Sequence, residues 1–266
     1  MSKYTLFWFR RDLRLHDNAG FYRALRNHSN VLPIFIFDKN ILDKLDDKKD
    51  RRVEFIHQAI TDLDTQLKAM GSGLLVKYGT PETIFPELLS TYDIEAVYTN
   101  HDFESYAIER DNMVHEYLQS EGVEFRTFKD HVIFEKNEVL SGSKTPYTVF
   151  TPYSRKWKET LNDFYVKSYP TEKYFSHLSK INLPEPPSLE SMGFAPVGMS
   201  FPVKEVKDLL VKNYAEKRDF PAILGTSRLS VHLRFGTVSI RELVKKAQNL
   251  SETWLNELIW RDFYFN

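Results

Sequence analysis

The first 128 residues alternate between apolar segments of strand length and segments with the apolar periodicity of helices. The clearest helix is predicted over 51–70, where apolar residues recur every three or four positions and Gly71 ends the pattern. Strands joined by helices pair in parallel, and a parallel sheet needs cover on both faces. The pattern therefore predicts an α/β domain over residues 1–135, with a parallel five-stranded Rossmann-like sheet flanked by helices. The predicted strands are 3–10, 31–37, 73–78, 96–99 and 123–128, and the other helices are 19–27, one starting at 80–81, and 105–120.

The loops that follow the strands hold the candidate ligand-binding residues of this domain. Ligands of open parallel sheets bind beyond the carboxyl ends of the strands, where the strand order reverses. The loops at that edge are residues 10–12, 37–38 and 101–104. In place of a G-x-G-x-x-G pattern the first carries Arg-Arg-Asp-Leu-Arg, which argues against a dinucleotide pyrophosphate held in the usual way. The alternative is that these polar loops only satisfy the ends of neighbouring helices.

Prolines recur from Pro146 to Pro202 and interrupt any long periodic pattern there. One helix is predicted within this stretch, over residues 153–164, with Trp157 between two lysines. Those lysines could contact nucleic acid, but a helix with one buried tryptophan and solvated lysines is the simpler interpretation. Residues 136–200 are therefore predicted to be an interdomain connector.

Past Pro202 the chain is predicted to be helical, and one of its turns has the composition of a phosphate site. A helix is expected from residue 203 to 210, running on toward residues 214–218. Residues 225–230, Gly-Thr-Ser-Arg-Leu-Ser, then place hydroxyls and a guanidinium where another helix begins. Backbone N–H groups beside such side chains suit a phosphate. The alternative is a helix N-cap and nothing more.

Gly236 is expected to end that helix, and a capping box of Ser239 and Glu242 opens the next one. The last helix begins near Ser251, and its surface mixes indoles with charge. An acid and an arginine among tryptophans must be paired or face a cavity if the helix is buried. The alternative is an ordinary i, i+4 ion pair between two of its residues. The side chains concerned are Trp254, Glu257, Leu258, Trp260 and Arg261, and the ion pair would join Glu257 to Arg261.

Several ordered phrases of this sequence resemble the photolyase/cryptochrome family. They are WFRRDLRLHDN near the N-terminus, Tyr214 followed by Arg218, GTSRLSVHLRFGTVS, and WLNELIWRDFY. The wording WLNELIW is closest to class I cyclobutane pyrimidine dimer photolyases. The resemblance extends from Phe7 to the last residue, loosely between about 140 and 200. It implies that residues 201–266 are the first part of an all-helical FAD-binding catalytic domain, and that the chain is truncated within that domain.

The resemblance also implies the chemistry and the residues that serve it. The activity is light-driven DNA repair, in which reduced FAD donates an electron that splits a cyclobutane pyrimidine dimer. Because the family's flavin domain continues beyond residue 266, the fragment alone is expected to bind flavin weakly and to be inactive. The residues implied as cofactor contacts are Tyr214, Thr226, Ser227, Arg228, Leu229, Ser230, Trp254 and Arg261. Those implied at the lesion or DNA are the catalytic pair Glu257 and Trp260, with Arg218 and Arg261.

In the N-terminal domain, the resemblance implies a possible antenna chromophore, a folate or a deazaflavin, with Glu104 among its contacts. DNA containing pyrimidine dimers is the implied partner, and no protein partner is implied. A cryptochrome-type blue-light photoreceptor is the first alternative, because it shares the scaffold and the cofactor. A stand-alone α/β nucleotide-binding domain with a helical interaction arm is the second; it would give Glu257 no role.

Composition excludes several other classes of function. The chain has no cysteine, so it has neither disulfides nor thiolate metal sites, and its scattered histidines lack the spacing of a zinc helix. No apolar run reaches the roughly 20 residues that span a bilayer, and no signal-peptide pattern is present. A cytoplasmic protein without a metal site is therefore expected. The formal net charge of -1 does not by itself announce nucleic-acid binding.

Overall fold

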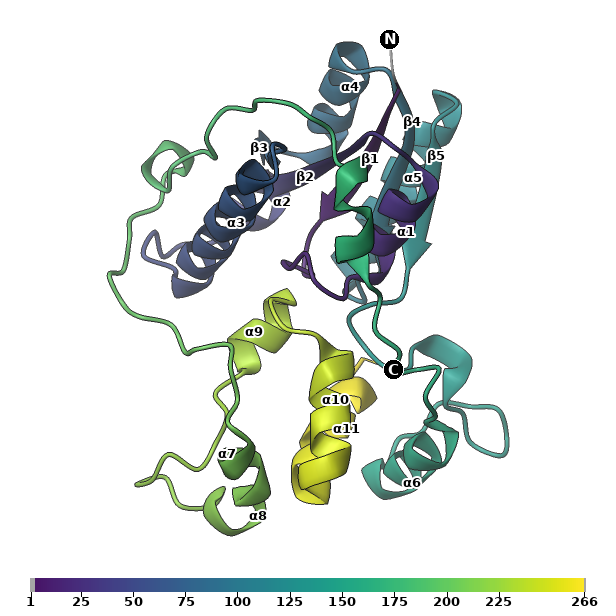
Figure 1. The fold of residues 1–266 in the computed structure, drawn as a ribbon, viewed down its shortest axis with the longest axis vertical. Helices are drawn as coiled ribbons and strands as arrows, with labels where there is room; N and C mark the ends of the chain where they lie inside the picture. The colour runs from purple at the N-terminus through teal and green to yellow at the C-terminus, as the bar shows by residue number, and fades with distance from the viewer. Residues whose placement is uncertain (1–2, 266) are drawn as a thin grey trace. The chain divides into compact units, whose positions relative to one another are not determined.

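The computed structural model describes residues 3–265, which form two compact units (Figure 1). The sheet unit comprises Met1–Asp130 and Tyr169–Phe201, and the helical unit comprises His131–Ser168 and Pro202–Asn266. The stretch predicted as a separate connector, 136–200, is thus divided between the two units. Its first part joins the helical unit because Trp157 is buried there, and its second part follows the sheet unit, where the Ser179 N–H donates to the Val31 carbonyl (2.9 Å).

The sheet unit contains the five-stranded parallel sheet that the alternating pattern predicted, which confirms the fold class. The strand order is β3-β2-β1-β4-β5, so the order reverses between β1 and β4. All four neighbouring pairs are parallel. The carboxyl ends of β1 and β4 therefore lie side by side at the place where sheets of this kind bind ligands. The strands are β1 Tyr4–Phe9, β2 Val31–Asp38, β3 Leu75–Gly79, β4 Ile94–Asn100 and β5 Glu124–Phe128.

Both faces of the sheet are covered because the central strand is apolar on both sides. Phe7 faces α1, where its ring lies 5.0 Å from that of Phe21. Trp8 points to the opposite face and meets Phe85 of α4 at 5.1 Å. Because successive side chains of β1 point to opposite faces and both faces are buried, the strand is apolar throughout rather than alternately apolar and polar. The helices of this unit are α1 Ala19–Asn27, α2 Lys39–Leu42, α3 Arg51–Ala69, α4 Pro81–Thr91 and α5 Ser105–Ser120, with 3-10 turns at Thr171–His177 and Glu190–Met192.

In the last part of the helical unit, the capping and glycine signals predicted from the sequence mark the starts and ends of helices. The Ser239 hydroxyl accepts from the Glu242 N–H at the start of α10, and the Ser251 hydroxyl does the same for Trp254 in α11. Gly236, with φ 64°, ends α9 in the left-handed conformation that glycine favours. The helices are α6 Phe150–Thr160, α7 Asp208–Lys212, α8 Tyr214–Lys217, α9 Ser230–Phe235, α10 Ile240–Leu250 and α11 Glu252–Phe263, with a 3-10 turn at Lys136–Glu138.

Two predictions for this unit were wrong. The helix expected from residue 203 onward starts only at Asp208 and breaks at Asn213, so two short helices replace one. The expected apolar stripe is largely unburied, since Val203 is 70% and Leu209 69% exposed, and it gains little from a continuous helix. The helix predicted over 153–164 covers 150–160 instead. It can begin before Pro152 because a proline in the first turn forfeits no intrahelical hydrogen bond.

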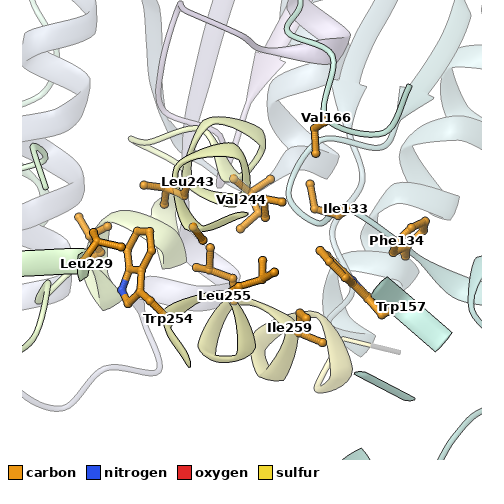
Figure 2. Packing of buried hydrophobic residues seen from close by; sticks show 14 of the residues in the cluster. Ile133, Phe134, Trp157, Val166, Leu229, Leu243, Val244, Trp254, Leu255 and Ile259 are labelled. Carbon is orange, nitrogen blue, oxygen red and sulfur yellow. The ribbon is translucent and has the colours of Figure 1, made fainter. Parts of the chain in front are cut away.

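A buried carboxylate ties the last helix into the core of the helical unit, whose apolar side chains are shown in Figure 2. Asp262 of α11 accepts from the Trp157 indole N–H (3.1 Å) and from the backbone N–H groups of Ile133 (3.1 Å) and Phe134 (3.3 Å). All three bonds reach the same oxygen, Oδ2. Burial raises the pKa of Asp262 to about 6, against the opposing effect of Arg261 and of these hydrogen bonds.

The stability of the helical unit should therefore depend on pH through Asp262. A carboxyl group whose pKa is higher in the folded chain binds more protons when folded, so the free energy of unfolding falls as pH rises from about 4 to about 6. Asp262→Asn keeps an oxygen for the three donors and should remove this slope. The measurement is denaturant unfolding at several pH values in that window. The exposed Asp163→Asn is the control, and a slope that survives in Asp262→Asn would contradict the assignment.

Candidate functional site

Side chains of the N-terminal Arg-Arg-Asp-Leu-Arg segment, residues 10–14, form a buried polar network with neighbouring side chains. Asp12 accepts from the side-chain amides of Asn100 (2.6 Å) and Asn18 (3.1 Å), and Arg14 pairs with Asp130 (2.7 Å). These side chains are almost fully buried, and burial raises the pKa of Asp12. The network fixes the start of α1 against the end of β4. Asp12 is thus a structural residue, as the alternative interpretation of these loops held.

The other charged residues of these loops form ion pairs across the ends of β1 and β4, and most of their side chains are largely buried. Arg11 binds Asp102 (2.9 Å) and the predicted antenna residue Glu104 (3.0 Å), whose side chain is 51% exposed. Arg10 pairs with Asp111. At the end of β2, Asp38 accepts from the Tyr106 hydroxyl (2.6 Å), and burial raises the pKa of its carboxyl group. The edge where the strand order reverses is therefore rich in charge.

Two guanidinium groups lie close to the ring of Trp8 at the same edge. The guanidinium carbons of Arg10 and Arg110 are 5.0 Å and 4.9 Å from its ring. Burial lowers the pKa of Arg110, and the neighbouring charge of Arg10 acts in the same direction. Arginines and carboxylates thus form one cluster at the carboxyl ends of β1 and β4, with Glu104 at its exposed margin.

In the helical unit, the turn predicted as a phosphate site lines a groove of about 500 Å³. Thr226, Ser227 and Arg228 contribute hydroxyls and a guanidinium to it. Its other walls are mainly apolar, from Val203, Val206, Leu209, Leu210 and Leu224, with Asn213, Lys207 and Lys217 also at the groove. The acid Glu205 also lines the groove, so an apolar wall is combined there with polar groups and with charges of both signs.

The backbone of this turn is held in an unusual conformation. Arg228 has φ 54°, in the left-handed region that costs a non-glycine residue about 1 kcal/mol or more. Gly225 packs so closely on α8 that an added Cβ would lie 2.4 Å from the Lys217 carbonyl oxygen. Only glycine fits there, so the turn is set by contact with α8 as well as by its own sequence.

The alternative interpretation, that residues 225–230 serve only as a helix N-cap, was wrong. The next helix, α9, has six residues and starts at Ser230, and its N-cap residue Leu229 makes no side-chain capping bond. The hydroxyls of Thr226 and Ser227 therefore serve no cap. A phosphate here would be held by side chains and loop backbone, because so short a helix has little dipole to offer.

On α11, Glu257 pairs with Arg218 of the neighbouring segment and not with Arg261 as the alternative interpretation held. Both side chains are 35% exposed. The Arg218 guanidinium also lies 5.4 Å from the centre of the Tyr214 ring. The hydrogen bond with Glu257 raises the pKa of Arg218. Arg261 turns inward and donates to the carbonyls of His131 (2.7 Å) and Leu233 (3.2 Å).

Trp260 is half-buried and lies flat against Phe150 of α6, with ring centroids 3.6 Å apart and planes at 5°. Trp254 and Leu229, both predicted flavin contacts, are buried in the hydrophobic core of the helical unit (Figure 2). The structure thus brings together Tyr214, Arg218 and Glu257 at one place and residues 226–228 at another. Ser230 is exposed at the start of α9.

Two important residues escaped the sequence reasoning. Phe150 could not be found, because 110 positions separate it from Trp260 and no spacing links them. Asp262 left a signal that was missed. It continues the buried stripe of Leu255, Leu258 and Ile259 at helical spacing, and an acid in such a stripe must be hydrogen-bonded inside.

The described part of the chain has neither a candidate metal site nor a candidate membrane-spanning helix. Among residues 3–265, no group of three or more His, Asp or Glu side chains is placed to hold a metal ion. Within the same residues, no helix combines the length and apolarity needed to cross a membrane.

The sequence model of the DNA photolyase family matches residues 5–173. A deoxyribodipyrimidine photo-lyase from a Synechococcus strain is 32% identical over 99% of this chain and 60% of its own length. A cryptochrome-1 of Spalax judaei is 27% identical over 100% of this chain and 51% of its own length.

Among solved structures, an archaeal photolyase from Sulfolobus tokodaii with two FAD molecules aligns with a TM-score of 0.70 and 25% identity. The alignment covers 98% of this chain and 58% of that one. The chain therefore spans about 60% of the length of the curated photo-lyases that it matches.

The contact of Gly225 with α8 generates a prediction about the groove. Gly225→Ala places a methyl group against the backbone of Lys217, and overpacking of this kind typically costs about 1–3 kcal/mol. We expect a matching loss in the free energy of unfolding, measured by denaturant titration. Gly142→Ala is the matched control, because a Cβ at that glycine meets nothing within 4 Å. Equal stability of the two variants would show that the turn does not depend on this contact.

Proposed function

The chain belongs to the DNA photolyase family, and from this membership we propose that the whole protein is a deoxyribodipyrimidine photo-lyase. In this function, light and reduced FAD split cyclobutane pyrimidine dimers in DNA. The observation that carries the proposal is the pair of features in the helical unit. A groove is lined by two hydroxyls and Arg228, and a separate accessible surface carries Glu257 and Trp260.

The groove has the chemistry that a flavin dinucleotide needs. Its hydroxyls and guanidinium can donate to phosphate oxygens, and charge-assisted bonds of this kind are the stronger ones. Its apolar wall suits planar rings. FAD, when bound, would supply the electron that opens the dimer. Thr226, Ser227 and Arg228 would contact its phosphates, and the apolar wall of the groove its rings. Tyr214, Leu229 and Trp254 are buried in the core of the helical unit and would act through packing rather than by direct contact.

Glu257 and Trp260 would meet the damaged bases. The carboxylate of Glu257, held by Arg218, can accept from a pyrimidine N–H, and the indole offers a stacking surface. Arg218 carries a positive charge that can reach a phosphate when it leaves Glu257. A dimer must leave the duplex stack to reach these groups, which costs a few kcal/mol and less than for an intact pair.

At the sheet edge, the cluster of Arg10, Arg11, Asp102 and Glu104 is the proposed site of an antenna chromophore, a folate or a deazaflavin. Its support is the position at the strand-order reversal, where sheets of this kind bind planar ligands. The Sulfolobus tokodaii photolyase holds two FAD molecules, with the implication of a novel light-harvesting cofactor in that protein, which makes FAD a third candidate here. A cytoplasmic location accords with a substrate that is cellular DNA.

A cryptochrome-type photoreceptor is the second candidate, because a cryptochrome is among the relatives. The two are separated by one assay on the full-length protein. Blue light should remove pyrimidine dimers from an irradiated oligonucleotide if the protein is a photolyase and leave them intact if it is a photoreceptor. The stand-alone nucleotide-binding alternative is separated by Glu257→Ala, which should abolish repair in a photolyase and have no effect on nucleotide binding by the sheet unit.

The groove generates a prediction for the chain itself. We expect weak flavin binding, with FAD bound more tightly than riboflavin, because only FAD carries phosphates for Arg228 and the two hydroxyls. Arg228→Ala should weaken FAD binding about tenfold, the loss of one charge-assisted hydrogen bond, and leave riboflavin binding unchanged. Flavin fluorescence titration measures both.

The exposed Arg155→Ala, on α6 and outside the groove, is the control for a general loss of positive charge. Equal affinity for FAD and riboflavin in the wild-type chain, or an Arg228→Ala variant that binds FAD as well as wild type, would place the phosphate contact elsewhere.

A further inference from the structure

The apolar wall of the groove begins with residues 202–207, a segment that has little regular structure to hold it in place. These residues belong to no helix or strand, and Val203 is 70% exposed. A segment that buries little apolar surface and lies outside the helices is loosely ordered unless other contacts fix it. Most of its residues nevertheless line the groove. Its position must therefore be set by contacts with other parts of the helical unit.

Two side chains from other elements bind the backbone of this segment. Nε2 of His232, on α9, lies 2.7 Å from the carbonyl oxygen of Pro202. The ammonium group of Lys246, on α10, lies 2.6 Å from the carbonyl oxygen of Val206. Because a carbonyl oxygen only accepts, Nε2 of His232 carries the proton and donates it. The wall is thus held at its first residue by an imidazole and four residues later by an ammonium group.

His232 holds the apolar wall from the helix that follows the polar turn, residues 226–228. That helix, α9, begins at Ser230, directly after the turn that brings two hydroxyls and a guanidinium to the groove. His232 is only 2% exposed, and its Nδ1 lies 2.7 Å from the Thr237 hydroxyl. One buried imidazole therefore joins the two sides of the groove, the polar turn through α9 and the apolar wall through Pro202.

The protonation state of His232 suits both of these hydrogen bonds. Burial lowers the pKa of His232, and the positive charge of Lys204 acts in the same direction, against the Pro202 carbonyl and Glu205. A neutral imidazole has one donor, which Pro202 accepts, and one acceptor, to which the Thr237 hydroxyl donates. Because both nitrogens are engaged, the orientation of the ring is fixed, and with it the distance across the groove.

We propose that His232 is a positioning residue of the groove, which sets the spacing between the apolar wall and the polar turn without touching the ligand. That the ligand is a flavin rests on the proposed function, whereas the bond to Pro202 is a feature of the chain itself. Loss of this bond would free the wall that packs against planar rings, and FAD and riboflavin share those rings. The effect thus differs from that of Arg228, which concerns the phosphates of FAD alone.

Two substitutions separate the two hydrogen bonds of His232. The amide of glutamine reaches the position of Nε2, whereas the shorter asparagine reaches only that of Nδ1. We expect His232→Asn to bind FAD and riboflavin each about fivefold more weakly than wild type, which corresponds to the loss of one hydrogen bond. His232→Gln should bind both as wild type does. Flavin fluorescence titration measures the affinities.

A second measurement needs no flavin. Hydrogen exchange of the backbone amides of residues 203–207, followed by mass spectrometry, reports how firmly the wall is held. It should be about fivefold faster in His232→Asn than in wild type and unchanged in His232→Gln. Unchanged exchange in the strands of the sheet unit shows that the variants are folded.

His57→Asn is the matched control, because Nε2 of His57 makes the same kind of bond in the sheet unit, 2.9 Å from the Pro187 carbonyl oxygen. It should alter neither exchange at residues 203–207 nor flavin affinity. The proposal is overturned if His232→Asn leaves exchange at residues 203–207 unchanged, or if His232→Gln is impaired as much as His232→Asn. It is also overturned if His57→Asn has the same effect on these residues.

The exchange measurement keeps this result separate from the proposed function. If the wild-type chain binds no flavin while exchange at residues 203–207 still accelerates in His232→Asn, the positioning of the wall is upheld and the proposed flavin site fails. If the wild-type chain prefers FAD to riboflavin but His232→Asn lowers neither affinity, the flavin site is upheld and the positioning role of His232 is overturned.

Discussion

The candidate site on α11 depends on the buried carboxylate of Asp262. A helix that carries Glu257 and Trp260 on one face must be held firmly by the opposite face, and apolar contacts alone fix its rotation poorly. Asp262 accepts three hydrogen bonds, one from α6 and two from residues 133–134. Because these bonds have defined directions, they set the rotation of α11 about its own axis. The cost is a carboxyl group kept out of water, which appears as its raised pKa.

The sheet unit uses the same device at its own edge. Asp12 is buried and accepts from Asn18 and Asn100, which holds the start of α1 against β4. Gly20 belongs to this arrangement, because an added Cβ would lie 2.7 Å from the Asn100 side-chain oxygen. In each unit, one buried acid accepts hydrogen bonds that fix the backbone around it. The segment Arg-Arg-Asp-Leu-Arg thus gives Asp12 and Arg14 to the buried network, and Arg10 and Arg11 to largely buried ion pairs that end at the exposed Glu104, a division that sequence alone could not make.

Patterns among neighbouring residues predicted most of the fold, but they did not predict the geometry of the candidate site. The start of α1, the capping of α10 and α11 and the end of α9 follow from side chains within a few positions of each other. The pairing of Glu257 with Arg218 joins residues 39 positions apart, and its rival at i, i+4 was equally plausible from spacing. Arg261 does not pair with Glu257 because its guanidinium donates to two backbone carbonyls, and no sequence pattern predicts a contact with a carbonyl. The false helix after Pro202 arose because apolar periodicity was taken to mean burial.

The short helix α8 connects the groove with the face of α11. The carbonyl of Lys217, its last residue, is the group against which Gly225 packs, so α8 positions the turn that carries Thr226, Ser227 and Arg228. The next residue, Arg218, binds Glu257, and Tyr214 at the start of α8 lies under the same guanidinium. One turn of helix therefore contacts both the hydroxyl-lined groove and the acid of α11. Because a four-residue helix has little stability of its own, its position is set by tertiary contacts: these two and the burial of Tyr214 in the core of the helical unit.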